Sequence, residues 1–395
     1  MNPAPPLDRR GALRLLAGAA APAALPAGAF ADPAARPRVA VIGAGIMGVS
    51  IAYHLAARGA QVTVLEKASP GGGATQGAFA MLIATHDEDR ALNDLYGLAV
   101  LDWRRLEAEL GFAVKIQWGG TCSWAAPGPA ADALTGQTRR LQGWGAPVQA
   151  IDADDLRRLA PGVEPGSFGA GNFSPEQGTL DPTQALDALL AAARARGVAF
   201  LDRCQVLSLQ RTGPAITAAV TTRGPIEADV FVLAAGAATP DLAGPLGVKT
   251  PINVVSGTLA HSAPFPRQLR RVLNGPAGSL KQDPDGRIVI GPDYRPGANG
   301  LDVSQAYGER LLQTAAQVMP PLAGARLERM TLGFVPIPTD SRPIVGFCAA
   351  PANLYVALTM SGVTMAPLMG RFAASEVVDH ITIESLSPYR PSRFG

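Results

Sequence analysis

The sequence predicts an α/β fold in which a domain built on a parallel sheet is interleaved with an α+β domain built on an antiparallel sheet. Three observations lead to this prediction. The β-branched run Arg38–Ile42 is followed by a glycine-rich turn, a helical segment and a second apolar strand, Gln61–Leu65. Another buried strand is expected at Asp229–Leu233, before a second turn of small residues. The long amphipathic segment Leu92–Leu110 and the strand-like segment Gly278–Pro292 are typical of an α+β region.

Composition and charge exclude several classes of function. The chain has 395 residues, enough for two closely connected domains, and 47% hydrophobic with 17% charged residues is an ordinary globular mixture. With a formal charge of +2 and no run of lysine and arginine, no nucleic-acid partner is expected. Cys122, Cys204 and Cys348 lie far apart, so neither a disulfide framework nor a metal site is predicted.

Residues 1–31 differ from the rest of the chain. Arg9 and Arg10 precede an alanine-rich apolar stretch, Gly11–Phe30, and Ala29-Phe30-Ala31 has the small-x-small pattern of a cleavage site. This segment resembles a twin-arginine export signal, which implies a periplasmic protein without a membrane span after processing. The alternative is a disordered tail on a cytoplasmic protein. A membrane anchor is less expected, because an arginine and two prolines interrupt the segment.

The first glycine-rich turn indicates a Rossmann-like nucleotide-binding element. It reads Gly43-Ala44-Gly45-Ile46-Met47-Gly48 between the first strand and the first helix. Gly43 permits the tight turn, Gly45 lets a pyrophosphate approach the backbone, and Gly48 allows close packing of helix and strand. Glu66 ends the second strand, where a carboxylate accepts hydrogen bonds from ribose hydroxyls.

Three later segments favour FAD over NAD as the dinucleotide. The run Asp229–Thr239, with Gly236 in its turn, is expected to make a second nucleotide contact. In Leu201–Leu209, Val206 stands where such folds hold adenine through backbone groups. A C-terminal helix is predicted to begin near Gly362, and its positive end would stabilise negative charge at the pyrimidine edge of a reduced flavin.

Taken in order, these segments resemble the family of D-amino-acid oxidases, glycine oxidase, monomeric sarcosine oxidase and D-amino-acid dehydrogenases. The likeness runs from about Arg38 to Val378 and includes VIGAGIMG, VTVLEK, GGGATQGAFAM, GTLDP, DVFVLAAGA, DSRPIVG and MSGVTMAP. It implies an FAD-binding domain of residues 38–90, 171–245 and 332–383, a substrate domain of residues 91–170 and 246–331, and a C-terminal tail, 384–395.

The resemblance also implies which residues bind the cofactor. These are Gly43, Ala44, Gly45, Ile46, Met47, Gly48, Glu66, Lys67, Thr75, Gln76, Val206, Ala235, Gly236, Gly362, Val363 and Thr364. Non-covalent binding is expected, because Gly333 occupies the position of the linking cysteine in sarcosine oxidase.

In the family, a neutral amine donates a hydride from its α-carbon to flavin N5, and the resulting imine hydrolyses. The flavin is the reagent, so no catalytic base is assigned. His54, His86, His261 and His380 are interpreted as structural. Oxygen and a quinone both stay open as the electron acceptor.

Substrate anchoring departs from the family pattern. Amino-acid-oxidising members bind the substrate carboxylate with an arginine. Here Val335, Met360 and Thr364 stand at three positions for polar anchors. Lys281 and Arg342 are the remaining candidates for a carboxylate, with an exposed sheet lysine and a pair with Asp340 as their respective alternatives.

The substrate pocket is predicted to include Lys281, Val335, Arg342 and Met360. If neither cation lines it, an uncharged or bulky apolar amine becomes the more plausible substrate. The competing interpretation is a flavin-binding protein with a degenerate pocket and no catalytic role.

Overall fold

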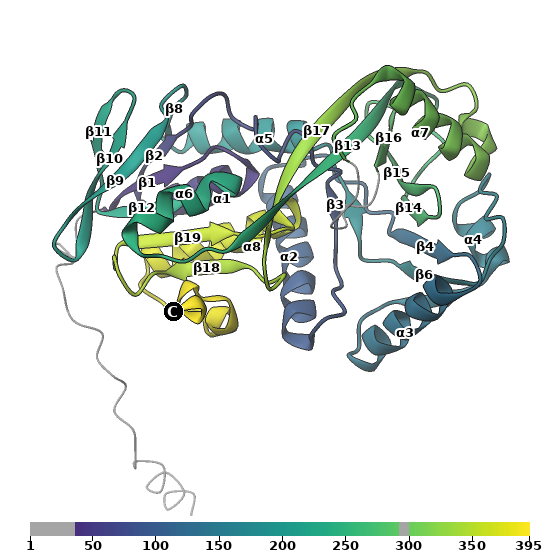
Figure 1. Ribbon diagram of the computed structural model, residues 1–395, viewed down its shortest axis with the longest axis horizontal. Helices are drawn as coiled ribbons and strands as arrows, with labels where there is room; N and C mark the ends of the chain where they lie inside the picture. Colours follow the sequence, from purple (N-terminus) through teal and green to yellow (C-terminus); the bar gives the residue numbers. More distant parts are fainter. Residues whose placement is uncertain (1–35, 292–299) are drawn as a thin grey trace, which may run out of the picture. The chain divides into compact units, whose positions relative to one another are not determined.

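The computed structural model describes residues 36–291 and 300–395, and the chain from Pro37 onward forms one compact unit (Figure 1). The predicted export signal lies outside the described residues. Within the described part, no helix is long and apolar enough to cross a membrane. The α-helices are α1 (Ile46–Ala57), α2 (Arg90–Glu109), α3 (Pro129–Gly143), α4 (Ala153–Leu159), α5 (Pro182–Ala195), α6 (Thr239–Ala243), α7 (Gln305–Val318) and α8 (Gly362–Val377).

A six-stranded sheet carries the glycine-rich turn. Its strands are parallel except for the edge strand β18, which runs antiparallel to β19. The order is β18 (Ile344–Phe347), β19 (Leu354–Leu358), β12 (Val230–Leu233), β1 (Arg38–Ile42), β2 (Gln61–Leu65) and β8 (Ala199–Leu201). The strands predicted at Arg38–Ile42 and Gln61–Leu65 are confirmed, and so is the parallel sheet.

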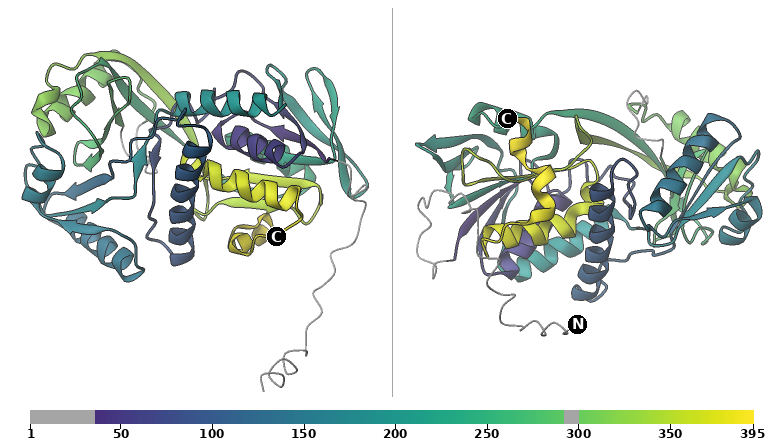
Figure 2. Two further views of the ribbon diagram at one scale, coloured as in Figure 1. Left: turned by 180° about the vertical axis from the view of Figure 1, so that it is seen from behind. Right: turned by 90° about the horizontal axis from the view of Figure 1, so that it is seen from below.

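Both faces of this sheet are buried, which explains why its strands are apolar throughout. Val39 and Val41 of β1 pack with α1, α2, α5 and α8 on one face. Ala40 and Ile42 point to the other face, against a three-stranded sheet of β11 (Gly224–Glu227), β10 (Ala215–Thr221) and β9 (Val206–Thr212). Figure 2 shows the helical layer from two further sides.

An eight-stranded sheet forms the second layered region. All of its neighbouring strands run antiparallel except the parallel pair β14–β4, a detail that the prediction of an antiparallel sheet did not include. Its order is β17 (Leu327–Pro338), β13 (Ile252–Pro264), β16 (Arg287–Gly291), β15 (Gly278–Gln282), β14 (Val272–Gly275), β4 (Thr121–Ala125), β6 (Ala170–Ser174) and β5 (Gln149–Ile151). Helix α7 covers one face, where Leu312 and Ala315 join the core.

The predicted domain boundaries cut through two strands of this sheet. Residues 171–174 of β6 and 332–338 of β17 lie in the eight-stranded sheet, although the resemblance assigns them to the FAD-binding domain. The C-terminal tail forms two 3-10 helices, Glu384–Tyr389 and Pro391–Phe394. It is packed in place, since Tyr389 is buried and Arg390 forms an ion pair with Glu376 of α8.

Close backbone packing holds the glycine-rich turn. Gly43 has φ of 104°, a left-handed conformation that favours glycine, and a Cβ there would lie 2.4 Å from the carbonyl oxygen of Ala234. A Cβ on Gly48 would lie 2.0 Å from the carbonyl oxygen of Gly43. The start of α1, the end of β1 and the end of β12 can therefore approach each other only without these side chains.

Replacing Gly48 with alanine is expected to destabilise the protein by about 3 kcal/mol or more, because the added methyl group overlaps backbone atoms that cannot rotate away. Urea unfolding measures this. Gly136→Ala is the matched control: a Cβ there, in α3, meets nothing within 4 Å, and a gain of up to about 1 kcal/mol is expected. Equal stability of Gly48→Ala and the wild type would contradict the packing account.

Candidate functional site

The predicted nucleotide contacts meet at one edge of the six-stranded sheet. Gly43 follows β1, Glu66 follows β2, Gly236 follows β12 and Gly362 follows β19 across a short turn. Because these four strands are parallel, their carboxyl ends lie together, at the edge where α/β sheets bind ligands.

Helix α1 presents an open N-terminus at this edge. Its N-cap, Gly45, provides no side-chain hydrogen bond, and its first turn contains no acidic residue. The hydroxyl of Thr75 accepts a hydrogen bond from the backbone N–H of Ile46 at 3.1 Å, which brings the predicted Thr75 to the turn. Gln76 instead donates to the carbonyl of Gly72 in its own loop and is exposed. No acidic side chain of the helix itself therefore occupies the positive end of α1.

The predicted adenine side of the site is also assembled. Glu66 accepts hydrogen bonds from the backbone of Ala44 at 2.8 Å and of Ala68 at 2.9 Å, which fixes its carboxylate beside the turn. The N–H of Cys204 donates to the carbonyl of Glu66 at 2.8 Å. That bond places the segment leading into Val206 alongside Glu66, while Lys67 is exposed next to it.

The start of α8 is held by residues that sequence reasoning missed. Ser361, its N-cap, makes no capping bond and accepts a hydrogen bond from the hydroxyl of Tyr96 at 2.7 Å. The indole N–H of Trp103 donates to the carbonyl of Val363 at 2.9 Å. Burial raises the pKa of Tyr96 to about 12, so its hydroxyl stays a donor. Tyr96 and Trp103 lie seven residues apart on α2, a spacing that could have identified one face of that helix.

Thr364 ties the same helix to the loop that carries Thr75. Its hydroxyl donates to the carbonyl of Met81 at 3.1 Å and accepts from the N–H of Ile83 at 3.2 Å. Met81 belongs to β3 (Met81–Leu82), which pairs with β7 (Gly178–Thr179). The predicted cofactor residue Thr364 therefore positions the backbone around Met81.

That loop contains a strained residue at its end. Ala80 has φ of 58°, a conformation that is uncommon outside glycine. Its carbonyl accepts hydrogen bonds from the hydroxyl of Thr179 at 3.1 Å and from the N–H of Leu180 at 3.2 Å. Such strain persists only where neighbouring contacts fix the backbone.

Lys281, on the eight-stranded sheet, supports the segment that is bonded to Ala80. It is 1% exposed, its ammonium donates to the carbonyl of Leu180 at 2.6 Å, and it forms an ion pair with Asp283 at 2.7 Å. Its Nζ also lies 5.6 Å from the ring centroid of Phe79. The alternative of a solvent-exposed lysine is wrong, because the loop at Phe79 and the segment at Leu180 cover this strand. Contact with a substrate carboxylate stays a prediction.

The other predicted pocket residues lie in different surroundings. Arg342 forms an ion pair with Asp89, the N-cap of α2, at 2.8 Å, and only its backbone N–H donates to Asp340. The alternative of a side-chain pair with Asp340 is therefore wrong, since Arg393 occupies that carboxylate. Val335 is half-buried on β17, opposite Val255 of β13, and Met360 is half-buried just before α8.

Two glycines mark where the loop meets β17. A Cβ on Gly77 would lie 2.4 Å from the Cα of Gly333, and a Cβ on Gly333 would lie 2.9 Å from the carbonyl oxygen of Gly77. Val335 lies two residues beyond Gly333 and so faces the same side of the strand. This side of the eight-stranded sheet is therefore the one turned toward the cofactor loop.

His261 is buried on that same side. Its Nε2 lies 2.8 Å from the hydroxyl oxygen of Thr331, and its Nδ1 has no hydrogen-bond partner within the described part of the chain. Burial, reinforced by the charges of Arg329 and Lys281, lowers the pKa of His261 to about 3. The imidazole is therefore neutral at physiological pH.

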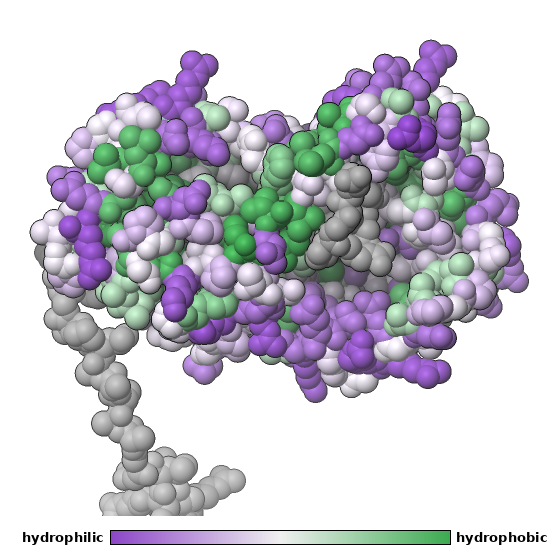
Figure 3. Space-filling view, viewed as in Figure 1, coloured by the Kyte–Doolittle hydropathy of each residue, from purple (hydrophilic) through white to green (hydrophobic). Residues whose placement is uncertain are grey.

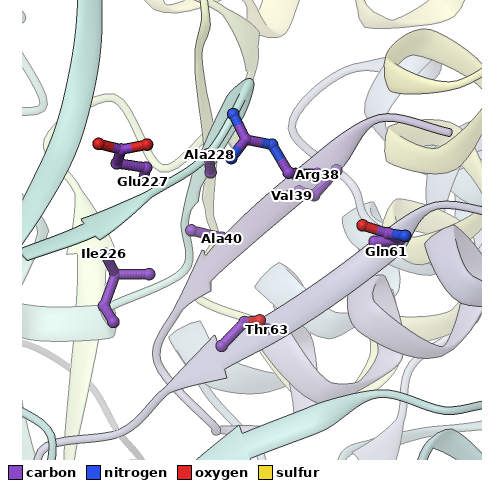
Figure 4. Close-up of a pocket in the computed structure, with 8 residues that line it drawn as sticks. All are labelled: Arg38, Val39, Ala40, Gln61, Thr63, Ile226, Glu227 and Ala228. Atoms are coloured by element: carbon purple, nitrogen blue, oxygen red, sulfur yellow. The ribbon is translucent and has the colours of Figure 1, made fainter. Parts of the chain in front are cut away.

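A small cavity lies away from the nucleotide edge. Figure 4 shows this cavity of about 120 Å³, lined by residues of β1 and β2, by the end of β11 and by Ala228 after it. Arg38 and Gln61 are among its lining residues, and they begin their strands. It is at the amino ends of the parallel strands and so opposite to the nucleotide edge. Among the described residues, no group of three or more His, Cys, Asp or Glu is arranged to hold a metal ion.

The residues at the nucleotide edge fit FAD. A Cβ on Gly45 would meet only Thr75 Oγ1, at 3.4 Å, and a Cβ on Gly236 or Gly362 would meet nothing within 4 Å. These three backbone positions can therefore be approached closely by a ligand, and two of them begin or adjoin helix N-termini suited to phosphate or to a reduced flavin.

The neutral state of His261 predicts how stability depends on pH. An unfolded histidine, with a pKa near 6.5, takes up a proton that the folded imidazole does not, so stability should fall as the pH drops from about 6.5 toward 3, by about 1.4 kcal/mol per pH unit. Above pH 6.5 this contribution is constant.

His261→Gln keeps a polar group near Thr331 and removes the titration, so the variant should lose stability less steeply between pH 6.5 and 4.5 than the wild type. Urea unfolding of both proteins at several pH values measures the difference. Parallel curves for the two proteins would show that His261 is not the group responsible.

Comparison with known proteins agrees with this geometry. The family model DAO, described as FAD dependent oxidoreductase, matches residues 38–376. The chain is 25% identical over 365 residues to glycine oxidase of Geobacillus kaustophilus, covering 90% of this chain and 96% of that protein. It is 26% identical over 377 residues to the bifunctional protein ThiO/ThiG of Synechocystis, covering 90% of this chain. The chain spans about half of that longer relative, 54% of its length.

A solved structure shows the same fold. L-proline dehydrogenase from P. horikoshii superposes with a TM-score of 0.81 at 23% identity, covering 91% of this chain and 98% of that one. The family model, over residues 38–376, includes the glycine-rich turn and α8 up to Glu376. The chain therefore belongs to the DAO family, and it is an FAD-dependent oxidoreductase.

Proposed function

We propose that this oxidoreductase oxidises the carbon–nitrogen bond of a small amine that lacks a free carboxylate. The observation that carries the proposal is that Lys281 and Arg342, the two cations predicted for the substrate carboxylate, are each paired with an aspartate. The relatives do not favour the interpretation of a non-catalytic flavin-binding protein. One of them is a glycine oxidase, and the match covers nearly the whole length of that enzyme.

Non-covalent attachment of FAD is part of the proposal. Gly333 has no side chain, and a Cβ there would lie 2.9 Å from the backbone of Gly77. Cys348 is the nearest cysteine in sequence, but it is buried in the core between the six-stranded and three-stranded sheets. Burial raises the pKa of the Cys348 thiol to about 12, which disfavours a nucleophilic thiolate.

The chain's part in the reaction is to bind, orient and exclude water. Bound FAD supplies a hydride acceptor at its N5 atom. The substrate loses a hydride from its α-carbon while the nitrogen lone pair forms the C=N bond, and the nitrogen gives up a proton to solvent. Water then hydrolyses the imine to a carbonyl compound and ammonia, or to an amine where the nitrogen carries a further substituent. Phe79, Leu259 and the partly buried Met81 belong to one apolar cluster, which would keep water from a reacting carbon placed against it.

The engaged cations support a substrate without a carboxylate. Lys281 is paired with Asp283, and Arg342 with Asp89. Val335 and Met360 have no charge to offer, and the hydroxyl of Thr364 is bonded at Met81 and Ile83. A carboxylate beside these two cations would lose hydration while each of them is already paired with an aspartate, which is costly.

Anaerobic mixing with a panel of amines tests the activity. Addition of a substrate amine should bleach the oxidised flavin absorbance near 450 nm, and amines without a carboxylate should do so at lower concentration than glycine or other amino acids. FAD released from the same preparation by heat is the control and should not react. No bleaching by any amine or amino acid would refute C–N oxidation.

The same samples identify the electron acceptor. After reduction, air or a soluble quinone is added, and the rate of flavin reoxidation is measured. Rapid return of the absorbance in air indicates an oxidase, whereas return only with quinone indicates a dehydrogenase.

Export by the twin-arginine route is a separate proposal, supported by Arg9, Arg10 and the alanine-rich segment after them. Replacing both arginines with lysine is expected to leave the protein in the cytoplasm, since the pathway depends on the arginine pair. Cell fractionation followed by immunoblotting measures this, with Arg36→Lys as a matched control outside the signal. An unchanged periplasmic location of the double variant would contradict the proposal.

A further inference from the structure

A row of uncharged polar side chains crosses the eight-stranded sheet. Ser279 of β15 pairs with Asn274 of β14, Asn274 pairs with Ser123 of β4, and Ser123 pairs with Asn172 of β6. Residues directly opposite each other in neighbouring strands project from the same face of a sheet. The four side chains therefore form one continuous line on one face.

This line faces the cofactor loop rather than the core under α7. Leu273 and Cys122, each next to a member of the row, point to the opposite face and join the core that contains Leu312 of α7. Val272, two residues before Asn274, packs with Phe79 of the cofactor loop. The row thus lies on the same side as Phe79.

The row also continues toward the proposed reaction site. Ser279 pairs with Gly291 of β16. A Cβ on Gly291 would lie 3.5 Å from the ring of Phe79 and 2.6 Å from Leu259. From the apolar cluster at Phe79, the line therefore leads through Ser279 to Asn274 and Ser123, one strand spacing at a time.

Three members of the row are accessible. Asn274 is exposed, and Ser123 and Ser279 are half-buried, whereas Asn172 is buried and donates to Thr138 of α3 at 3.0 Å. The hydroxyl of Ser279 donates to Oδ1 of Asn274 at 3.2 Å, which orients the amide so that its NH₂ group remains a donor. Ser123 adds a hydroxyl that can donate or accept.

We infer that Ser279, Asn274 and Ser123 form the specificity wall of the substrate site, and that the substrate carries a carboxamide on the far side of its oxidisable amine. This inference rests on the proposed amine oxidation. A carboxamide matches the wall because it offers a carbonyl acceptor to the Asn274 amide and N–H donors to the Ser123 hydroxyl, and it has no charge to leave unpaired.

The surface on the other side of the same sheet region does not compete for this role. Val254 and Phe334 are about half exposed on the outward face of β13 and β17, and apolar surface is visible over these strands in Figure 3. They alternate with Val255 and Val335, which face the cofactor loop, so they cannot contact a substrate at Phe79.

The test compares three amines of equal shape: 4-aminobutanamide, 4-aminobutanoate and 4-methylpentan-1-amine, together with the shorter series glycinamide, glycine and 2-methylpropan-1-amine. Anaerobic stopped-flow of the holoenzyme gives the rate of flavin reduction and the half-saturating concentration for each. In the preferred series, the amide should saturate at a concentration at least about fivefold lower than the hydrocarbon, the effect of an ordinary hydrogen bond, and lower than the carboxylate.

Asn274→Leu should raise half-saturation by the amide about fivefold or more and leave that of the hydrocarbon amine unchanged or lower, with little effect on the limiting reduction rate of either. Asn274→Asp should further raise the half-saturating concentration of the carboxylate, 4-aminobutanoate. Because Asn274 is exposed, neither change is expected to prevent folding. Gln210→Leu, an exposed polar position on β9, is the matched control and should alter none of the three amines.

The outcomes separate the two proposals. If hydrocarbon amines reduce the flavin but the amide has no advantage, or if Asn274→Leu affects all three amines equally, the specificity wall is refuted while amine oxidation stands. Preference for the carboxylate also refutes it. If no compound of either series or of the wider panel reduces the flavin, amine oxidation fails and the inference falls with it.

Discussion

The close approach of backbone at Gly43, Gly48 and Ala234 is the constraint on which the rest of the structure depends. It brings the ends of β1 and β12 and the start of α1 within contact distance, at positions where a Cβ would overlap a carbonyl oxygen. The other contacts at the nucleotide edge depend on the position of this turn. Thr75 reaches the first turn of α1, Glu66 reaches Ala44, and the loop that follows Thr75 is delivered to the eight-stranded sheet. A shift of the turn would displace all of these together.

The second half of the site depends on contacts between elements far apart in the chain. Helix α8 begins at the correct place because Tyr96 and Trp103 of α2 bond its first turn while Thr364 bonds β3. Lys281 performs a similar task from the sheet, since its bond to Leu180 supports the segment that holds Ala80 in its strained conformation. The buried ion pair with Asp283 is better understood as part of this support than as a source of stability, because burying two charges costs nearly what their attraction returns.

Sequence patterns predicted what is local. The β-branched strands, the glycine spacing and the start of α8 near Gly362 follow from periodicity and backbone conformation within about thirty residues, and the structure confirms them. The burial of Lys281 could not be read in this way, because it is caused by Leu180, 101 residues away. The partner of Arg342 is likewise Asp89, and that of Tyr96 is Ser361. Alternation along a strand shows which residues share a face, but not which distant segment covers that face.

Electrostatic neutrality links the substrate class to the chemistry. In the described part of the site, Lys281 and Arg342 are paired and burial keeps His261 uncharged. Surroundings in which these two cations are already paired disfavour a carboxylate, and desolvation there would lower the pKa of a bound alkylamine. Only the neutral amine has the lone pair needed to form the C=N bond as the hydride leaves. A wall of serine and asparagine side chains therefore has two effects. It recognises a neutral polar group by hydrogen bonds. It also introduces no negative charge, which would hold the amine in its protonated, unreactive form.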